Sequence, residues 1–416
     1  MKKSILLSLF ISFCSLAFAN NMLVQNVSTT GNNAGAQTIQ VQFDISWDNS
    51  WRDDINWDAA WIFMKFKDAN GLWQHCKLNQ TGFTNGSGTA NTVQVTADKV
   101  GSWLYRSAQG AGTFNTTGIQ LQWNYGLSGL TDVTGLEVRV FAVEMVYVPE
   151  GEFNCAKRYH IGGGYWGDEY PFNAPGWNFP VVNTRLSPAI TTSITFRIKG
   201  DVGIDTNNDG IIDNETYPTG YRAFYAYKFE LSEQQFADFF NTLTSIQQTE
   251  LGIAGSEITI NNGSYYSSSP NKACGNSSTI QLLSLADWSG LRPMSILEFN
   301  KLTYGPFKPI ENGINAGIES VSLYTGSYRT GALGDVGLVY GKSFYGIMDV
   351  IGNAIEPVVQ PNGFTFGIFN GDGLIAATGL SDIPSWNSIT IDYIDNHGIR
   401  DYYASYNGFR YVRSAE

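Results

Sequence analysis

The stretch at positions 38–47 reads Thr-Ile-Gln-Val-Gln-Phe-Asp-Ile-Ser-Trp and alternates polar with apolar residues without a break. Because successive side chains of a strand point to opposite faces, this pattern predicts a strand with one buried face, formed by Ile39, Val41, Phe43, Ile45 and Trp47. Residues 119–125 and 136–140 alternate in the same way, with clusters of Gly, Asn and Thr between the segments. Repeated half-buried strands separated by turns predict an antiparallel β-sandwich domain over residues 20–143.

The composition is that of a folded protein rich in strands and turns. The 416 residues are 43% hydrophobic, 14% aromatic and 15% charged, and they include 45 glycines. Single cores stop growing at roughly 250–300 residues, so the length predicts two domains. The formal net charge is −12. Because such a surface repels phosphate backbones and anionic lipids, we expect neither a nucleic-acid partner nor a membrane-surface partner.

The first 19 residues have the pattern of a secretory signal peptide. Lys2 and Lys3 precede an apolar stretch at 5–16 that is too short to span a bilayer, and residues 17–19 form an Ala-Phe-Ala cleavage site. No later apolar run has the length of a membrane span. We therefore expect an exported protein without a span, in the periplasm or outside the cell, and the sequence does not distinguish these two locations.

The cysteines that follow the signal peptide are Cys76, Cys155 and Cys274. In an oxidising compartment three cysteines allow at most one disulfide, for which Cys155–Cys274 is the preferred pair, although the sequence leaves open whether it forms. Cys76 is interpreted as a buried residue. None of the three has the spacing of a zinc site.

Two helices and a row of tryptophans are interpreted as structural. Ser232-x-x-Gln235 and Ser295-x-x-Glu298 are capping boxes, and each precedes apolar residues at helical spacing. We interpret the tryptophans of the first domain as core and loop anchors rather than as a sugar-binding platform. They are Trp51, Trp57, Trp61, Trp73 and Trp103.

The segment 205–213 has the spacing of a calcium-binding loop. Oxygen ligands recur at its positions 1, 3, 5 and 9, a glycine at position 6 permits a sharp turn, and position 7 offers a backbone carbonyl. Position 12 is Thr216 instead of the usual bidentate Glu, so an Asn/Asp-rich turn is the alternative. The expected ligands are Asp205, Asn207, Asp209, the Ile211 carbonyl and Asp213.

Five blocks of the second half carry a resemblance to a known family. They lie at 145–153, 227–236, 286–294, 345–356 and 407–410, and they include Phe-Glu-Leu-Ser at 229–232, Gly-Leu-Arg-Pro-Met at 290–294 and Gly-Phe-Arg at 408–410. In this order they are similar to the formylglycine-generating enzyme, or sulfatase-modifying-factor, family. The resemblance implies an α+β fold related to C-type lectins over residues 144–416, following the β-sandwich domain.

The resemblance also implies a structural calcium site and the loss of the family's copper chemistry. The implied calcium ligands are the Asp349 side chain, the Gly352 and Ala354 carbonyls and the Glu356 side chain. The family's oxidases bind copper through two cysteines after the block at 345–356, and this chain has no cysteine beyond Cys274. We therefore expect calcium but no copper, and a pseudoenzyme on this scaffold.

The C-terminal region supplies a candidate ligand groove. Its tyrosines are Tyr393, Tyr402, Tyr403 and Tyr406. They could line a groove that stacks on a sugar or peptide, and the alternative is that they support long loops. Our leading hypothesis is a non-catalytic binding or structural protein of the cell envelope with a glycan, peptide or protein partner. The alternatives are an enzyme with rebuilt chemistry, either an oxidoreductase or a hydrolase using Asp residues after Asp372, and an assembly subunit whose aromatic N-terminal face packs on a partner.

Overall fold

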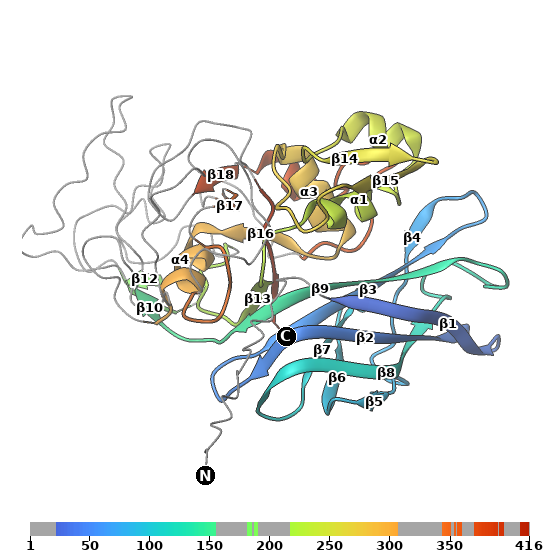
Figure 1. The fold of residues 1–416 in the computed structure, drawn as a ribbon, viewed down its shortest axis with the longest axis horizontal. Coiled ribbons are helices and arrows are strands. Elements are labelled where there is room, and N and C mark those ends of the chain that lie inside the picture. Colours follow the sequence, from blue (N-terminus) through green and yellow to red (C-terminus); the bar gives the residue numbers. More distant parts are fainter. Residues whose placement is uncertain are drawn as a thin grey trace, which may run out of the picture.

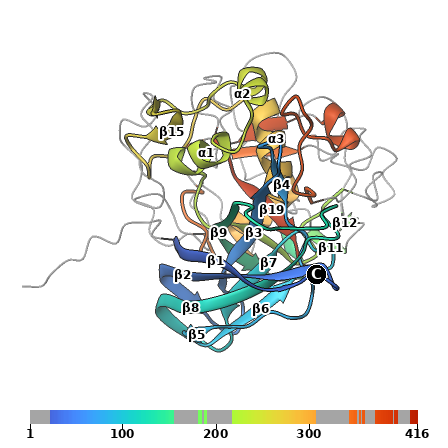
Figure 2. The same cartoon turned by 90° about the vertical axis from the view of Figure 1, so that its right-hand side faces the viewer.

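The structure is a computed structural model in which strands dominate over short helices, and the β-rich α+β class agrees with the expectation. It describes residues 22–154, 181–184, 187–189, 217–306, 343–350, 353–354, 356–359, 370–389, 391–394 and 408–415. Figures 1 and 2 show these residues from two directions, with the strands of the first 150 residues on one side and the helices on the other.

The first sheet is built around the strand that the alternating stretch predicts. Its four strands lie in the order β1-β2-β8-β5, and they are β1 (Leu23–Asn33), β2 (Thr38–Arg52), β8 (Gly110–Asn124) and β5 (Ser87–Gly88). β2 pairs antiparallel with both β1 and β8. All five apolar side chains expected on one face of β2 are buried, so this prediction is confirmed.

The second sheet has ten strands and joins the N-terminal and C-terminal halves of the chain. Along its main path the order is β18-β17-β16-β19-β13-β9-β3-β7-β6, and β4 pairs with β3. The strands are β3 (Asp58–Lys67), β4 (Trp73–His75), β6 (Asn91–Val95), β7 (Ser102–Arg106), β9 (Val138–Val148), β13 (Phe224–Tyr227), β16 (Arg292–Ser295), β17 (Glu356–Val359), β18 (Ile391–Ile394) and β19 (Tyr411–Ser414).

β9 is the strand through which the two halves are continuous. One of its edges pairs with β3 and the other pairs with β13, both antiparallel. The domain boundary expected between residues 143 and 144 therefore falls inside a strand. The C-terminal β19 adds to the same sheet, between β13 and β16.

The first sheet packs on one face of the second, and the two share a core. This core combines apolar side chains of β2 and β8 with side chains of β3, β6 and β7, including Phe43, Leu121, Ile62, Val93 and Leu104. Cys76 lies in the same core and is fully buried, as expected. Cys274 is also buried, and Cys155 lies outside the described residues.

The other face of the second sheet is covered by helices. Trp61 and Trp103, from β3 and β7, are buried in a cluster with Phe236, Phe239 and Trp288. The aromatic N-terminal face therefore packs on the C-terminal half of the same chain. β3 is consequently buried on both faces, which explains why its sequence does not alternate between polar and apolar residues. Trp61 and Trp103 are core anchors, as interpreted from the sequence, whereas Trp51, Trp57 and Trp73 are half-buried.

Four α-helices lie in the described part of the chain, and all begin with a capping box. α1 (Glu233–Phe240) and α4 (Ile296–Tyr304) are the two helices that the sequence predicts. α2 (Ser245–Leu251) and α3 (Thr279–Trp288) are additional, and their boxes are Thr244 with Gln247 and Ser278 with Gln281. Each box satisfies backbone N–H groups that the first helical turn leaves without partners.

The remaining elements are short. They are β10 (Phe153–Asn154), β11 (Val181–Thr184), β12 (Ser187–Ala189), β14 (Ile258–Asn261), β15 (Ser264–Ser267) and the 3-10 helix η2 (Pro384–Ser388). Among the helices that the structure describes, none has the length and apolar character needed to cross a membrane.

Candidate metal centres

A buried arginine connects three of the five sequence blocks. Arg410, which is fully buried, donates from Nη1 to the Tyr227 carbonyl at 3.1 Å and from Nη2 to the carbonyls of Met348 at 2.9 Å and Asp349 at 3.3 Å. β19 begins one residue after Arg410, so its position is fixed by the sheet. The Gly-Phe-Arg block at 408–410 thus packs directly against the blocks at 227–236 and 345–356.

Two of the calcium ligands implied by the resemblance lie beside this arginine. Asp349 is fully buried and its backbone is left-handed, with φ of 55°. Glu356 is 2% exposed and opens β17. Both Nε and Nη2 of Arg410 lie 3.3 Å from Oε1 of Glu356, which is longer than the 2.7–2.9 Å of a strong charge-assisted bond. The guanidinium therefore binds Glu356 only loosely.

A third buried carboxylate, Glu230, orders the loop between these two residues. It accepts hydrogen bonds from the Asn353 side chain and, at 2.8 Å, from the Ala354 backbone N–H. Burial raises the pKa of Glu230 well above its usual range, Asp349 raises it further, and Arg410 opposes the shift. Glu230 has no role that the sequence alone predicts, because its partners Asn353 and Ala354 are more than 120 residues away.

Three residues of the predicted calcium-ligand set are described, and calcium binding at them stays a prediction. Asp349 and Glu356 contact Arg410, Ala354 contacts Glu230, and Phe229, Ala273 and Met348 pack with Ala354. Gly352 lies outside the described residues. So does the whole loop expected to bind calcium through Asp205, Asn207, Asp209, Ile211 and Asp213.

The predicted tyrosine groove is also mostly outside the described residues. Tyr402, Tyr403 and Tyr406 are not described, and for Tyr393 the structure describes the backbone, in β18, but not the side chain. The groove stays a prediction.

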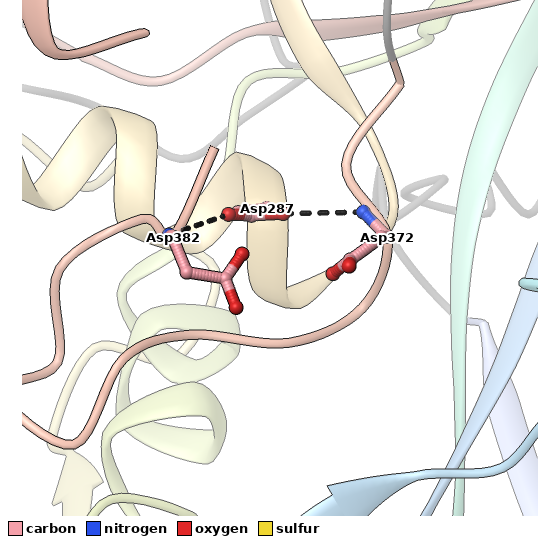
Figure 3. A group of neighbouring side chains, drawn as sticks. All are labelled: Asp287, Asp372 and Asp382. Atoms are coloured by element: carbon pink, nitrogen blue, oxygen red, sulfur yellow. Dashed lines mark hydrogen bonds between the residues drawn. The ribbon is translucent and has the colours of Figure 1, made fainter. Parts of the chain in front are cut away.

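A second acidic cluster was not predicted as a unit. Within the described ranges, one group of three acidic side chains brings its oxygens within 4.8 Å of one another, and it consists of Asp287, Asp372 and Asp382. In Figure 3 Asp287 projects from α3, and the carboxylates of Asp372 and Asp382 point toward one another from a separate loop, residues 372–382. The hydrolase alternative drew on the Asp residues after Asp372, and only the fold adds Asp287 to them.

Both oxygens of Asp287 already hold the loop in place. Oδ1 accepts a hydrogen bond from the Asp372 backbone N–H at 3.1 Å, and Oδ2 accepts from Ser381 Oγ at 2.6 Å and from the Asp382 N–H at 3.2 Å. Burial raises the pKa of Asp287 to about 7. Because its lone pairs are used by donors of the loop, Asp287 acts as a clamp on residues 371–382.

Positive groups of the N-terminal half approach the same loop. Lys65 donates to the carbonyls of Trp288, at 2.7 Å, and Gly373, and Lys77 donates to the Asp372 carbonyl at 2.9 Å. A Cβ atom at Gly373 would lie 2.1 Å from Nδ1 of His75, and φ there is 90°, so a glycine is required. These lysines compensate part of the acidic charge, so the trio is interpreted as a structural clamp.

Comparison of the chain with protein-family models, with curated proteins and with solved structures finds no match. The similarity to sulfatase-modifying factors therefore rests on the five sequence blocks alone, and it stays a prediction.

Proposed function

We propose that the chain is an exported, non-catalytic binding or structural protein, in which calcium braces a sulfatase-modifying-factor-like domain that follows a β-sandwich domain. One observation supports the proposal: Asp349 and Glu356, two of the implied calcium ligands, are buried close to Glu230 and Arg410. A buried carboxylate is costly unless a cation or hydrogen-bond donors compensate it. Calcium bound between Asp349 and Glu356 would supply part of that compensation.

The chemistry of the donor set suits calcium. Asp349 and Glu356 offer carboxylate oxygens, and the chain between them offers backbone carbonyls, which together form the hard, all-oxygen environment that calcium prefers. Arg410 lies 3.3 Å from Oε1 of Glu356, and in this proposal the same carboxylate also binds the calcium ion. In this proposal the Asp349 and Glu356 side chains and the carbonyls of Gly352 and Ala354 hold the ion.

The non-catalytic part of the proposal is supported by the sequence. The last cysteine is Cys274, which precedes the block at 345–356, whereas the family's copper ligands follow it. A rigid sheet that carries long loops suits recognition, because loops can vary while the scaffold stays fixed. We propose a glycan, peptide or protein of the cell envelope as the partner, with the C-terminal tyrosines as part of the contact surface.

A hydrolase is the second candidate, and the acidic cluster is the observation that favours it. Asp287 has a pKa raised to about 7 and lies beside Asp372 and Asp382, and two carboxyl groups with different proton affinities are what acid–base catalysis needs. Asp382 is exposed, so a substrate can reach one member of the cluster.

Binding and turnover screens on one protein sample distinguish the two candidates. We expect the mature protein to bind a glycan or peptide from an array in the presence of calcium, to lose that binding on chelation, and to release no product. Hydrolysis that is abolished in Asp372→Asn and retained in the exposed control Asp132→Asn would support the hydrolase instead.

A further inference from the structure

A lysine and two carboxylic acids, drawn from β3, β9 and the residue after β13, meet inside the protein. Asp58 begins β3, Glu144 lies in the middle strand β9, and Lys228 directly follows β13. Glu144 pairs with Ala60 of β3, and its carbonyl accepts the Lys228 backbone N–H at 3.0 Å. Because side chains two residues apart share a face, all three side chains lie on one face of the sheet.

The three side chains are in contact and are removed from water. Their residues are 0% exposed for Asp58, 4% for Glu144 and 5% for Lys228. Nζ of Lys228 contacts Oε1 of Glu144 directly and lies 3.7 Å from Oδ2 of Asp58. The same nitrogen donates to the Asn49 carbonyl at 3.2 Å, and it lies 4.8 Å from the centre of the Trp51 ring and 5.3 Å from that of Phe229.

The Asp58 carboxyl group is held in one orientation by three donors. Oδ1 accepts hydrogen bonds from Ser50 Oγ at 2.9 Å and from the Trp51 N–H at 3.0 Å, and Oδ2 accepts from Trp47 Nε1 at 2.8 Å. These donors are fixed by β2, which is anchored in the core through Trp47. An acyl group with hydrogen-bond donors on both oxygens is prepared to stabilise the oxyanion of a tetrahedral intermediate.

We propose that this trio forms an intramolecular isopeptide bond between Nζ of Lys228 and Cγ of Asp58, with Glu144 as the proton relay. The Glu144 acid passes its proton to the Asp58 carboxylate and accepts one from the Lys228 ammonium, which leaves a neutral amine beside two neutral acids. The amine nitrogen then attacks Cγ of Asp58. The nitrogen–carbon bond forms, one carbon–oxygen bond breaks, and the hydroxyl group leaves as water with a proton relayed from the amine by Glu144.

The environment favours each step of this condensation. Burial raises the pKa of Glu144 to about 8, so this acid carries a proton at neutral pH. In a medium of low dielectric constant, an amine and an acid are less costly than an ammonium and a carboxylate. Groups held in contact react with effective molarities on the order of 10⁵ M or more. The released water leaves an apolar site, so hydrolysis of the product is disfavoured.

The bond would connect the two halves of the molecule. β9 lies between β3 and β13 in the sheet, so a link from Asp58 to Lys228 passes over Glu144 and joins the outer two of three adjacent strands. In the noncovalent structure β3 and β13 each pair with β9 and do not pair with each other. The covalent link would close a loop over residues 58–228 in the denatured chain and so restrict its conformations.

Peptide mapping of the denatured native protein tests the proposal without any variant. Protease digestion followed by tandem mass spectrometry should yield a branched peptide that contains Asp58 and Lys228 and is lighter than its two parts by one water. Lys65 and Lys301 are internal controls, because both are buried but bind carbonyl oxygens, and their peptides should be linear. An unmodified Lys228 peptide, or one branched to Glu144 instead, overturns the proposal.

Two variants separate the chemistry from a merely structural ion pair. Glu144→Gln removes the proton relay but keeps both reacting groups, so the branched peptide should decrease at least ~100-fold. Asp58→Asn should form the same amide with loss of ammonia instead of water, and its denatured chain should migrate like that of the wild type. Full branching in Glu144→Gln contradicts the relay. If Glu144→Gln does not fold, the Asp58→Asn variant still tests whether the bond forms, because its peptide is branched only if the reaction occurs.

Discussion

Lys65 in β3 donates a 2.7 Å hydrogen bond to the carbonyl oxygen of Trp288, the last residue of α3. The residues are 223 positions apart, and the contact is one of several that join the N-terminal strands to the helical layer. Lys65 is 1% exposed, so its ammonium group is stabilised by carbonyl oxygens and by the Trp288 ring instead of by water. Burial lowers its pKa to about 7.

This contact predicts a specific dependence of stability on pH. The pKa of Lys65 is about 7 in the folded protein and 10.5 in the unfolded chain, so between these values the unfolded state binds more protons. The free energy of unfolding should therefore increase as the pH rises through this range. We expect urea titrations at about pH 8 and about pH 10 to show this increase, and Lys65→Met to reduce it. If the free energy of unfolding of Lys65→Met increased with pH as steeply as that of the wild type, the lowered pKa of Lys65 in the folded protein would be contradicted.

The Asp287 clamp predicts a local loss of order on substitution. In Asp287→Asn an amide NH₂ group faces N–H and O–H donors, so at least one hydrogen bond to residues 372–382 is lost, at a cost of about 1–3 kcal/mol. Hydrogen exchange of residues 371–383 should accelerate while exchange in β2 and β8 stays unchanged. Ser381→Ala, which removes one donor and leaves the carboxylate, is the graded control and should have a smaller effect. Equal exchange in all three proteins would exclude the clamp.

The Asp349–Glu356 site predicts unequal effects of one substitution with and without calcium. When calcium is bound, Glu356→Gln removes a ligand and should cost about 3 kcal/mol of unfolding free energy at calcium concentrations about 100 times the dissociation constant. Without the metal, the Gln amide oxygen still accepts from Arg410, so the same change should cost less than it does when calcium is bound. Glu257→Gln, at an acid that is 43% exposed, is the matched control. Equal destabilisation under both conditions would argue for a structural role of Glu356 alone.

The sequence predicts those parts of the fold whose residues face water on one side. The alternation in 38–47 identifies β2 and its buried face, and the capping boxes at Ser232 and Ser295 locate α1 and α4. β3 was not predicted, because a strand buried on both faces has no alternation to detect. The short apolar α3 is buried along most of its length, so its sequence has no polar face that marks a helix.

The candidate sites likewise differ in whether their residues are close together in the sequence. Asp349, Ala354 and Glu356 could be predicted because the residues of one short loop stay together in any fold. Glu230 and Arg410 complete that site from 119 and 61 positions away from Asp349 in the chain, and only the sheet order brings them there. The Asp287 cluster and the Asp58–Glu144–Lys228 trio are likewise products of tertiary structure, since each draws its members from distant segments.

The central claim is that calcium is bound between Asp349 and Glu356 and stabilises the second half of the chain. The most direct test is metal analysis of the purified mature protein by mass spectrometry, combined with melting curves before and after chelation and repeated on Glu356→Gln. We expect bound calcium, a melting temperature that falls on chelation, and one calcium fewer per chain in the variant. Stoichiometric copper or iron, or a wild-type protein with no metal and an unchanged melting temperature, would contradict the claim.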